Sequence, residues 1–117
     1  MEDKLIELLE TFGYKVRRQG SFLEDEAYPD TFITFWNADE SEAAAYDNET
    51  KRAAYIYNVN VYSNDPGITF SLLRDIRKLL KKNGYIITTR GRDVISGEPS
   101  HTGRGLDAVI VVDETEE

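Results

Sequence analysis

The 117-residue chain contains no cysteine, and this absence excludes several classes of chemistry at once. Disulfide frameworks, thiolate zinc sites, iron–sulfur clusters and cysteine nucleophiles all need a residue that the chain does not have. Long apolar runs are missing too, since no stretch approaches the roughly 18 residues that a membrane span requires. Met1 is followed by acidic residues rather than by a basic and then apolar leader. We therefore expect a protein of a reducing interior that has no membrane partner.

Histidine occurs once, as His101, which limits acid–base chemistry near neutral pH. Serine and aspartate residues lie nearby in sequence, so a Ser-His-Asp or a His-carboxylate arrangement can be drawn on paper. Zinc sites, however, use two or more His or Cys ligands at short intervals, a spacing that this sequence lacks. Gly103-Arg104-Gly105 lacks the Lys-Ser/Thr pair of a phosphate-binding loop and is interpreted as a turn that presents Arg104 to a neighbour. We predict no enzyme activity, no cofactor and no metal, and keep a small hydrolase as a third hypothesis.

Basic residues are absent from one long stretch of the chain. The whole sequence has 14 basic and 22 acidic residues, a net charge of −8. Residues 24–49 contain nine carboxylates and no Lys or Arg, whereas residues 74–92 contain seven basic residues against Asp75 alone. The net charge repels duplex phosphate, so we predict no sequence-specific nucleic-acid binding. Acidic and basic surfaces on one molecule favour head-to-tail contact with copies of itself or with other proteins, and two merely solvated faces are the alternative.

Apolar periodicity predicts two helices. Residues 2–12 carry leucines four positions apart, and Gly13 stands where a C-terminal cap belongs. A second helix begins at Pro66, which a first helical turn accepts, and ends before Asn83-Gly84. Its leucines and isoleucine lie on one side and its basic residues on the other, so we expect the apolar side to cover a sheet.

Alternating apolar, aromatic and β-branched residues predict strands at residues 14–19, 31–36, 54–62, 85–90 and 106–112. We expect the first at a sheet edge and the second and third paired antiparallel. Residues 1–112 are predicted to form a single α+β domain: a mostly antiparallel sheet of about five strands with two helices on one face, in the order α-β-β-β-α-β-β. Residues 113–117 are predicted to be a disordered acidic tail.

Two segments are predicted to be loops. Residues 37–52 have no large aliphatic side chain, which is typical of a functional or mobile loop, and we expect this acidic segment to gain order on contact with a partner. Paired acids within it could serve glycoside hydrolysis, but 117 residues leave little room for a sugar cleft beside a core. Residues 91–105, polar and rich in glycine, form the second predicted loop.

Aromatic residues beside the acidic stretch favour a protein interface. No basic residue lies between Trp36 and its aromatic neighbours, and the flanking carboxylates would repel the phosphates of a stacked nucleic acid. Trp and Tyr are common at the centres of protein interfaces. Our interface candidates are Trp36, Asp39, Glu40, Glu42, Tyr46, Arg74, Lys78, Lys81, Lys82 and Arg104.

Several strings, in this order along the chain, resemble small proteins from the late structural operons of tailed bacteriophages and prophages of Gram-positive bacteria. The strings are residues 1–14, Tyr28-Pro-Asp-Thr-Phe-Ile-Thr-Phe-Trp-Asn37, Tyr46-Asp-Asn48, Val59-Asn-Val-Tyr-Ser-Asn-Asp-Pro66 and Glu98-Pro-Ser-His-Thr-Gly-Arg-Gly105. The family comprises tail-terminator, tail-completion and head–tail joining proteins, which are minor structural proteins of long-tailed phages.

The resemblance implies an α/β subunit that assembles as a ring, usually a hexamer, at the end of the tail tube where the tail meets the head. It implies tail-tube or head–tail connector proteins as partners, and no catalytic residues. It also implies a location in the host bacterial cytoplasm during assembly and then in the virion tail or head–tail junction.

An acidic inhibitor, such as a DNA mimic that occupies a nucleic-acid-binding enzyme, is the alternative function. The carboxylates of residues 24–49 favour it. The helix that carries Lys78, Lys81 and Lys82 counts against it, because a basic stripe does not help a mimic of DNA.

Overall fold

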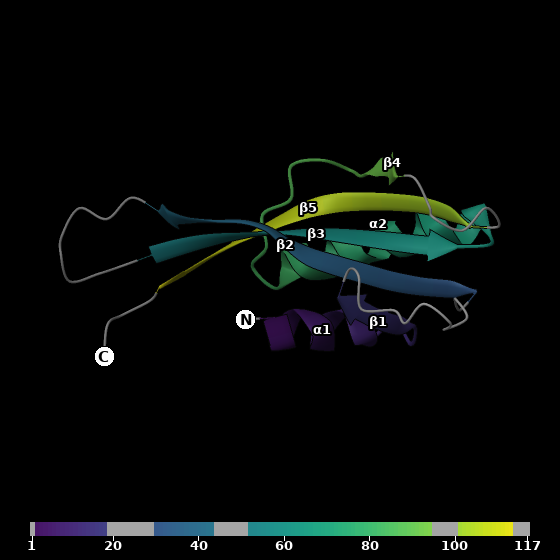
Figure 1. Cartoon of the computed structure of the whole chain (residues 1–117), viewed down its shortest axis with the longest axis horizontal. Helices are drawn as coiled ribbons and strands as arrows, with labels where there is room; N and C mark the ends of the chain where they lie inside the picture. Colours follow the sequence, from purple (N-terminus) through teal and green to yellow (C-terminus); the bar gives the residue numbers. More distant parts are fainter. Residues whose placement is uncertain (1, 19–29, 44–51, 95–100, 114–117) are drawn as a thin grey trace.

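The computed structural model describes residues 2–18, 30–43, 52–94 and 101–113 (Figure 1). Within these residues the elements are α1 (Glu2–Glu10), β1 (Lys15–Arg18), β2 (Thr31–Ala43), β3 (Arg52–Ser63), α2 (Pro66–Lys82), β4 (Arg92–Val94) and β5 (Thr102–Asp113). The predicted α+β class and the element order α-β-β-β-α-β-β are confirmed.

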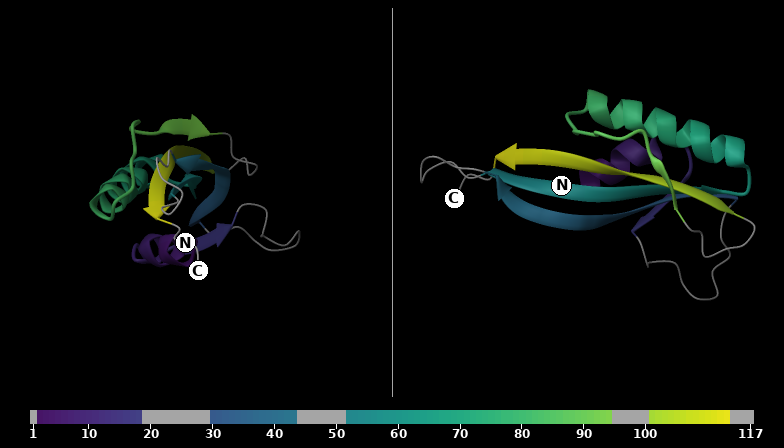
Figure 2. Two further views of the ribbon diagram at one scale, coloured as in Figure 1. Left: turned by 90° about the vertical axis from the view of Figure 1, so that its left-hand side faces the viewer. Right: turned by 90° about the horizontal axis from the view of Figure 1, so that it is seen from above.

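In the described part of the chain, the five strands form one sheet in the order β1-β2-β3-β5-β4. β1 lies at an edge, as predicted, and pairs parallel with β2. The other neighbouring strands pair antiparallel, and β3 is central because β2 covers one of its sides and β5 the other over its whole length. Figure 2 shows both helices against the same face of this sheet.

The core lies between the two helices and the inner face of the sheet. Its buried side chains are Leu5 and Leu9 of α1, Leu72, Leu73, Ile76 and Leu80 of α2, and Ile33, Phe35, Tyr57, Val59, Val61, Leu106 and Ala108 of the strands. Alternate residues of β3 point into it, as the pattern of residues 54–62 predicts. Tyr85 follows α2 into the core, where burial raises the pKa of its phenol.

α2 has matching signals at both of its ends. The Asp65 carboxylate accepts a hydrogen bond from the Gly67 N–H at 2.9 Å, and Pro66 fills a first-turn position that needs no N–H donor. Asn83 caps the C-terminus, and Gly84 follows at a φ of +95°, where a side chain would be strained. The two ends place the apolar stripe of α2 over β3 and β5.

β2 and β3 are longer than the sequence pattern predicts. The prediction of a long loop over residues 37–52 is wrong for residues 37–43 and for Arg52, which belong to these strands. Asn37 to Ala43 pair with Tyr57 to Arg52 along a continuous antiparallel ladder, with one irregularity between Asn37 and Asp39. This ladder is made by backbone hydrogen bonds, which do not depend on side-chain type. Where both faces of a strand are exposed, the sequence therefore shows no alternating apolar pattern. Residues 44–51 lie outside the described part.

The second predicted loop is also partly strand. Residues 85–90 contribute a single bridge between Ile86 and Val109 instead of a strand, while β4 and the first residues of β5 fall within 91–105. Gly103-Arg104-Gly105 is therefore not a turn. A Cβ on Gly105 would overlap Oδ1 of Asn60, and a Cβ on Gly103 would lie 2.7 Å from the Tyr62 ring. The two glycines let cross-strand side chains lie flat on β5.

The first prediction concerns the α2 core. Ile76 is fully buried, so Ile76→Ala should lower the free energy of unfolding by about 2 to 5 kcal/mol, as other large-to-small core changes do. Lys78→Ala, on the exposed side of the same helix, should change it by no more than about 0.5 kcal/mol. Urea denaturation followed by circular dichroism measures both. Equal effects would contradict this orientation of the helix.

The second prediction concerns the contact between Gly105 and Asn60. Gly105→Ala should cost about 1 to 3 kcal/mol, because the new methyl group displaces the amide of a buried side chain. The double variant Gly105→Ala, Asn60→Ala should lose less free energy of unfolding than the two single variants lose together, because removing the Asn60 amide makes room for the new methyl group. A double-mutant cycle from thermal unfolding tests the coupling, and additive effects would refute it.

Candidate functional site

β2, β3 and β5 extend beyond both helices as a three-stranded arm, at the left in Figure 1. We define the arm as residues 38–43, 52–56 and 109–113, which are held in register by the pairs of β3 with β2 and β5. β3 is buried from Tyr57 to Val61, but residues 53–56 are only half-buried. Among the described residues, neither helix covers the arm, so its residues are half-buried or exposed and accessible to a partner.

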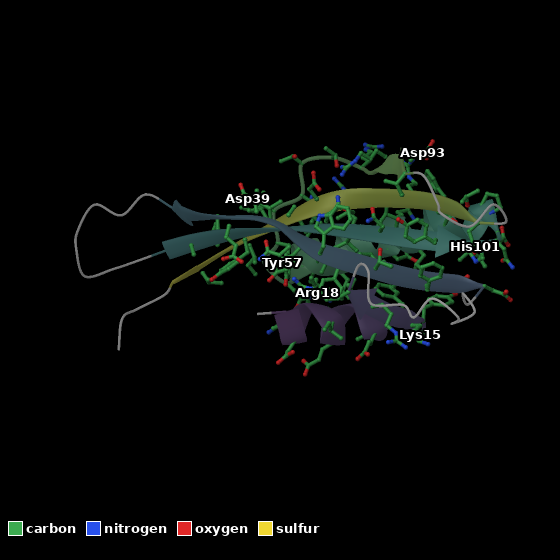
Figure 3. All side chains as sticks on the ribbon, viewed as in Figure 1. Lys15, Arg18, Asp39, Tyr57, Asp93 and His101 are labelled. Carbon is green, nitrogen blue, oxygen red and sulfur yellow. The ribbon has the colours of Figure 1, made fainter. Side chains whose placement is uncertain are left out.

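The arm and the segments that join it in sequence hold nearly all of the net charge. Residues 37–52 and 111–117 together contain nine acidic and two basic residues, a net charge of −7 out of −8 for the whole chain. Asp39 and Glu40 are exposed on β2, and Figure 3 labels Asp39 at the base of the arm. Trp36, 40% exposed, precedes them on the same strand.

The opposite charge gathers along α2. Lys78, Lys81 and Lys82 are exposed, in the last turns of the helix. Arg74 is exposed as well and lies 3.5 Å from the carboxylate of Asp75, a pairing that solvent screens strongly. The basic face that the sequence predicts is therefore real and accessible.

Four arginines converge beside α2 around a cavity of about 230 Å³. Its lining is Phe70, Arg74, Arg77, Arg90 and Arg104, which we call the arginine pocket. These residues come from α2, from the connection after it and from β5. The Phe70 ring is 56% exposed and supplies an apolar surface among the guanidinium groups.

Arg104 is fixed by contacts within the chain. Its guanidinium forms an ion pair with Asp93 at 3.0 Å, donates to the Gly91 carbonyl at 3.4 Å and stacks 5.2 Å from the centroid of the Phe70 ring. Arg77 Nε donates to the Thr89 carbonyl at 2.9 Å. These bonds draw the connection after α2 toward the helix and form one wall of the pocket.

The outer face of the sheet carries a buried polar row. Asn60 Nδ2 donates to Asn58 Oδ1 at 2.7 Å, and Asn58 Nδ2 donates to Asp107 at 2.9 Å. Arg92 lies 3.4 Å from the same carboxylate. This row explains why the asparagines of β3 are buried although they point away from the core, and it neutralises Arg92 within the chain.

His101 lies in a second cavity, of about 370 Å³, near the start of β5. Its imidazole packs against the Phe32 ring with centroids 5.8 Å apart. Threonine hydroxyls supply the nearby polar contacts, such as Thr69 Oγ1 to Thr102 Oγ1 at 2.9 Å. Among the described residues, no three His, Cys, Asp or Glu side chains are grouped as metal ligands.

The structure brings the predicted interface residues together in two places. Trp36, Asp39 and Glu40 belong to β2 at and beside the arm, while Arg74 and Arg104 line the arginine pocket. Tyr46 and the side chain of Glu42 lie outside the described part. The sequence reading missed Phe70, Arg77 and Arg90. The spacing of Phe70, Arg74 and Arg77 at i, i+4 and i+7 is a signal that could have found one flank of α2.

No protein-family model matches the sequence, and no curated protein matches it. The fold is similar to a solved structure described as the sheath/tube terminator, in the extended state, of an extracellular contractile injection system named PVC. The TM-score is 0.55 at 8% sequence identity, and the match covers 99% of this chain and 57% of that one. The chain thus spans somewhat over half the length of that terminator. No helix in the described ranges is long and apolar enough to cross a membrane.

The third prediction separates packing from charge at Arg104. Arg104→Ala should cost about 1 to 2 kcal/mol, because it removes a half-buried stem, a backbone hydrogen bond and the contact with Phe70. Asp93→Asn should cost less than about 1 kcal/mol, since the Asp93 side chain is 92% exposed and the ion pair is screened. Thermal unfolding at low salt measures both. A larger loss from Asp93→Asn would reverse the ranking.

Proposed function

We propose that the protein is a non-enzymatic structural subunit that closes the tube or sheath of a tail-like particle, in a phage tail or a related contractile apparatus. The observation that carries the proposal is the fold similarity to a sheath/tube terminator, which extends over 99% of this chain. The sequence strings that resemble tail-terminator proteins support the same role independently. This chain covers 57% of the matched terminator. That this shorter chain contacts both a sheath and a tube is therefore part of the proposal.

The surfaces of the molecule suit a subunit of an assembly. An uncovered acidic arm and a basic α2 face lie on different parts of one chain, as head-to-tail contact requires. Such contacts close into a ring when the rotation between neighbours divides a full turn, and a hexamer is the ring that the resemblance implies. We propose Trp36, Asp39, Glu40, Glu42 and Tyr46 on the acidic side, and Arg74, Lys78, Lys81, Lys82 and Arg104 on the basic side, as residues of these contacts.

The acidic arm also supports the alternative of an inhibitor that mimics DNA. The net charge of −7 over residues 37–52 and 111–117 is the observation in favour. The arginine pocket counts against it, because four guanidinium groups would repel the basic cleft of a nucleic-acid enzyme. We therefore favour the assembly subunit.

The fourth prediction tests the function in the particle. Deleting the gene from its own genome should give tubes of uncontrolled length or tails without heads, because nothing would close the growing end. Supplying the full chain from a plasmid should restore tails of uniform length. Electron microscopy of purified particles, with a gold-labelled tag on the chain, measures tail length and position.

The tagged chain should be found at one end of each tail. Normal tails in the deletion strain, or label distributed along the tube, would contradict the proposed function. Particles that are normal while a nucleic-acid enzyme of the host becomes more active would favour the inhibitor.

A further inference from the structure

We propose that the arginine pocket of one copy binds the acidic arm of the next copy. The proposal names the partner and the binding site for the assembly proposed above, and rests on that function only for its biological context. The ligand class is a carboxylate presented on an exposed β-strand. Asp39 of the arm is the group that enters the pocket, and Glu40, the next residue of the strand, points to the opposite face of the sheet and adds negative charge beside it.

The pocket holds positive charge that the chain itself does not neutralise. Arg104 is paired with Asp93 and Arg74 with Asp75, but within the described residues Arg77 and Arg90 form no ion pair. Their guanidinium groups lie around a partly enclosed space of about 230 Å³, where an entering anion is screened less than on an open surface. Planar guanidinium groups bind carboxylates with two parallel hydrogen bonds, so the pocket fits carboxylates well.

The arm presents such carboxylates in a fixed orientation. Asp39 and Glu40 follow the irregularity in the β2–β3 ladder, and the Glu40 N–H donates to Asp39 Oδ1 at 2.9 Å. Asn37 Nδ2 donates to Glu40 Oε2. Both acidic residues are exposed, and neither forms a salt bridge within the described part of the chain. Their charge is therefore available to another molecule.

The sheet prevents the arm from reaching the pocket of its own chain. Asp39 pairs with Ile56, which pairs with Val109, and Val109 is five residues along β5 from Arg104. Five strand residues span about 17 Å, and the continuous ladder keeps the two places apart. Figure 3 shows the same separation between Asp39 and Asp93, the ion-pair partner of Arg104. A second copy of the chain is therefore needed to bring arm and pocket together.

Apolar surface accompanies the charge on both sides. In the pocket, Phe70 is 56% exposed. Val111 on the arm is 42% exposed, and Trp36, just before the arm on β2, is 40% exposed. Aromatic and arginine side chains together are typical of the centre of a protein interface. A nucleic acid fits less well, because the net charge of −8 repels a polyanion that extends beyond the pocket.

The fifth prediction uses the absence of cysteine, which makes every disulfide the product of introduced residues. Ala38→Cys places a thiol beside Asp39, and Thr89→Cys places one beside Arg90, with no change in charge. Full-length variants are mixed at low salt in a glutathione buffer, with a mass tag on one of them. Mass spectrometry then counts heterodimers of tagged and untagged chains. Thr11→Cys, an exposed threonine at the end of α1, replaces Thr89→Cys as the matched control.

We expect the Ala38→Cys and Thr89→Cys mixture to give about tenfold more heterodimer than the control mixture, because paired charges hold the thiols together. Added 0.5 M NaCl should remove most of the excess. Equal yields from the two mixtures would overturn the proposal.

Charge reversal identifies the groups. In the Thr89→Cys chain, Arg74→Glu with Arg90→Glu should reduce the heterodimer about tenfold, and Asp39→Lys with Glu40→Lys in the Ala38→Cys chain should then restore it. Lys78→Glu with Lys82→Glu removes the same charge from outside the pocket and should cause a smaller loss. An equal loss would assign the contact to the exposed lysines and overturn the pocket. Circular dichroism checks that each variant is folded.

Three further outcomes separate this proposal from others. A duplex oligonucleotide that binds the chain through Arg74 and Arg90, and leaves the cross-link unchanged, would assign the pocket to nucleic acid and overturn the proposal. Cross-links that form as expected while the gene deletion leaves tails normal would support the contact and contradict the terminator function. Absent cross-links with uncontrolled tails would contradict the contact alone.

Discussion

The long antiparallel ladder of β3 with β2 on one side and β5 on the other is the constraint on which the rest of the structure depends. It runs the full length of β3, whereas the helices cover only the part from Tyr57 to Ser63 that is mostly buried. The covered part becomes the core, and the uncovered part becomes the arm. The same hydrogen bonds therefore produce both the stable body and the surface available to partners.

Much of the fold follows from sequence patterns where burial is one-sided. The stripe of α2, its Asp65 and Pro66 start and its Asn83-Gly84 end predict the helix almost to the residue, because one face packs on the sheet and the other is solvated. The distal half of β2 has no such pattern, since Asp39 and Glu40 are exposed on a part of the strand that, among the described residues, pairs with β3 alone. The composition of this segment is therefore typical of a loop, although its backbone is paired with β3.

The candidate site is harder to predict for a related reason. A helical flank with Phe70, Arg74 and Arg77 can be recognised from spacing, but Arg90 and Arg104 join it only through tertiary contacts. The Gly103-Arg104-Gly105 string is misleading, because glycine suggests a turn. Here the glycines make room for Tyr62 and Asn60 to lie across β5. The fold depends on the absence of a side chain at these two glycines and not on their conformational freedom.

The charge of the arm also limits what can bind it. β1 pairs only with residues 32–35 of β2, so in the described part of the chain the distal edge of β2 has unpaired backbone groups, which would attract another strand edge. A second arm is repelled, because residues 37–52 and 111–117 of each copy bring a net charge of −7 to the contact. A basic surface is attracted by the same charge, and the half-buried apolar residues of β3 and β5 then gain cover. The acidic residues thus oppose arm-to-arm pairing and favour arm-to-pocket contact, which turns a potentially aggregating edge into a directional one.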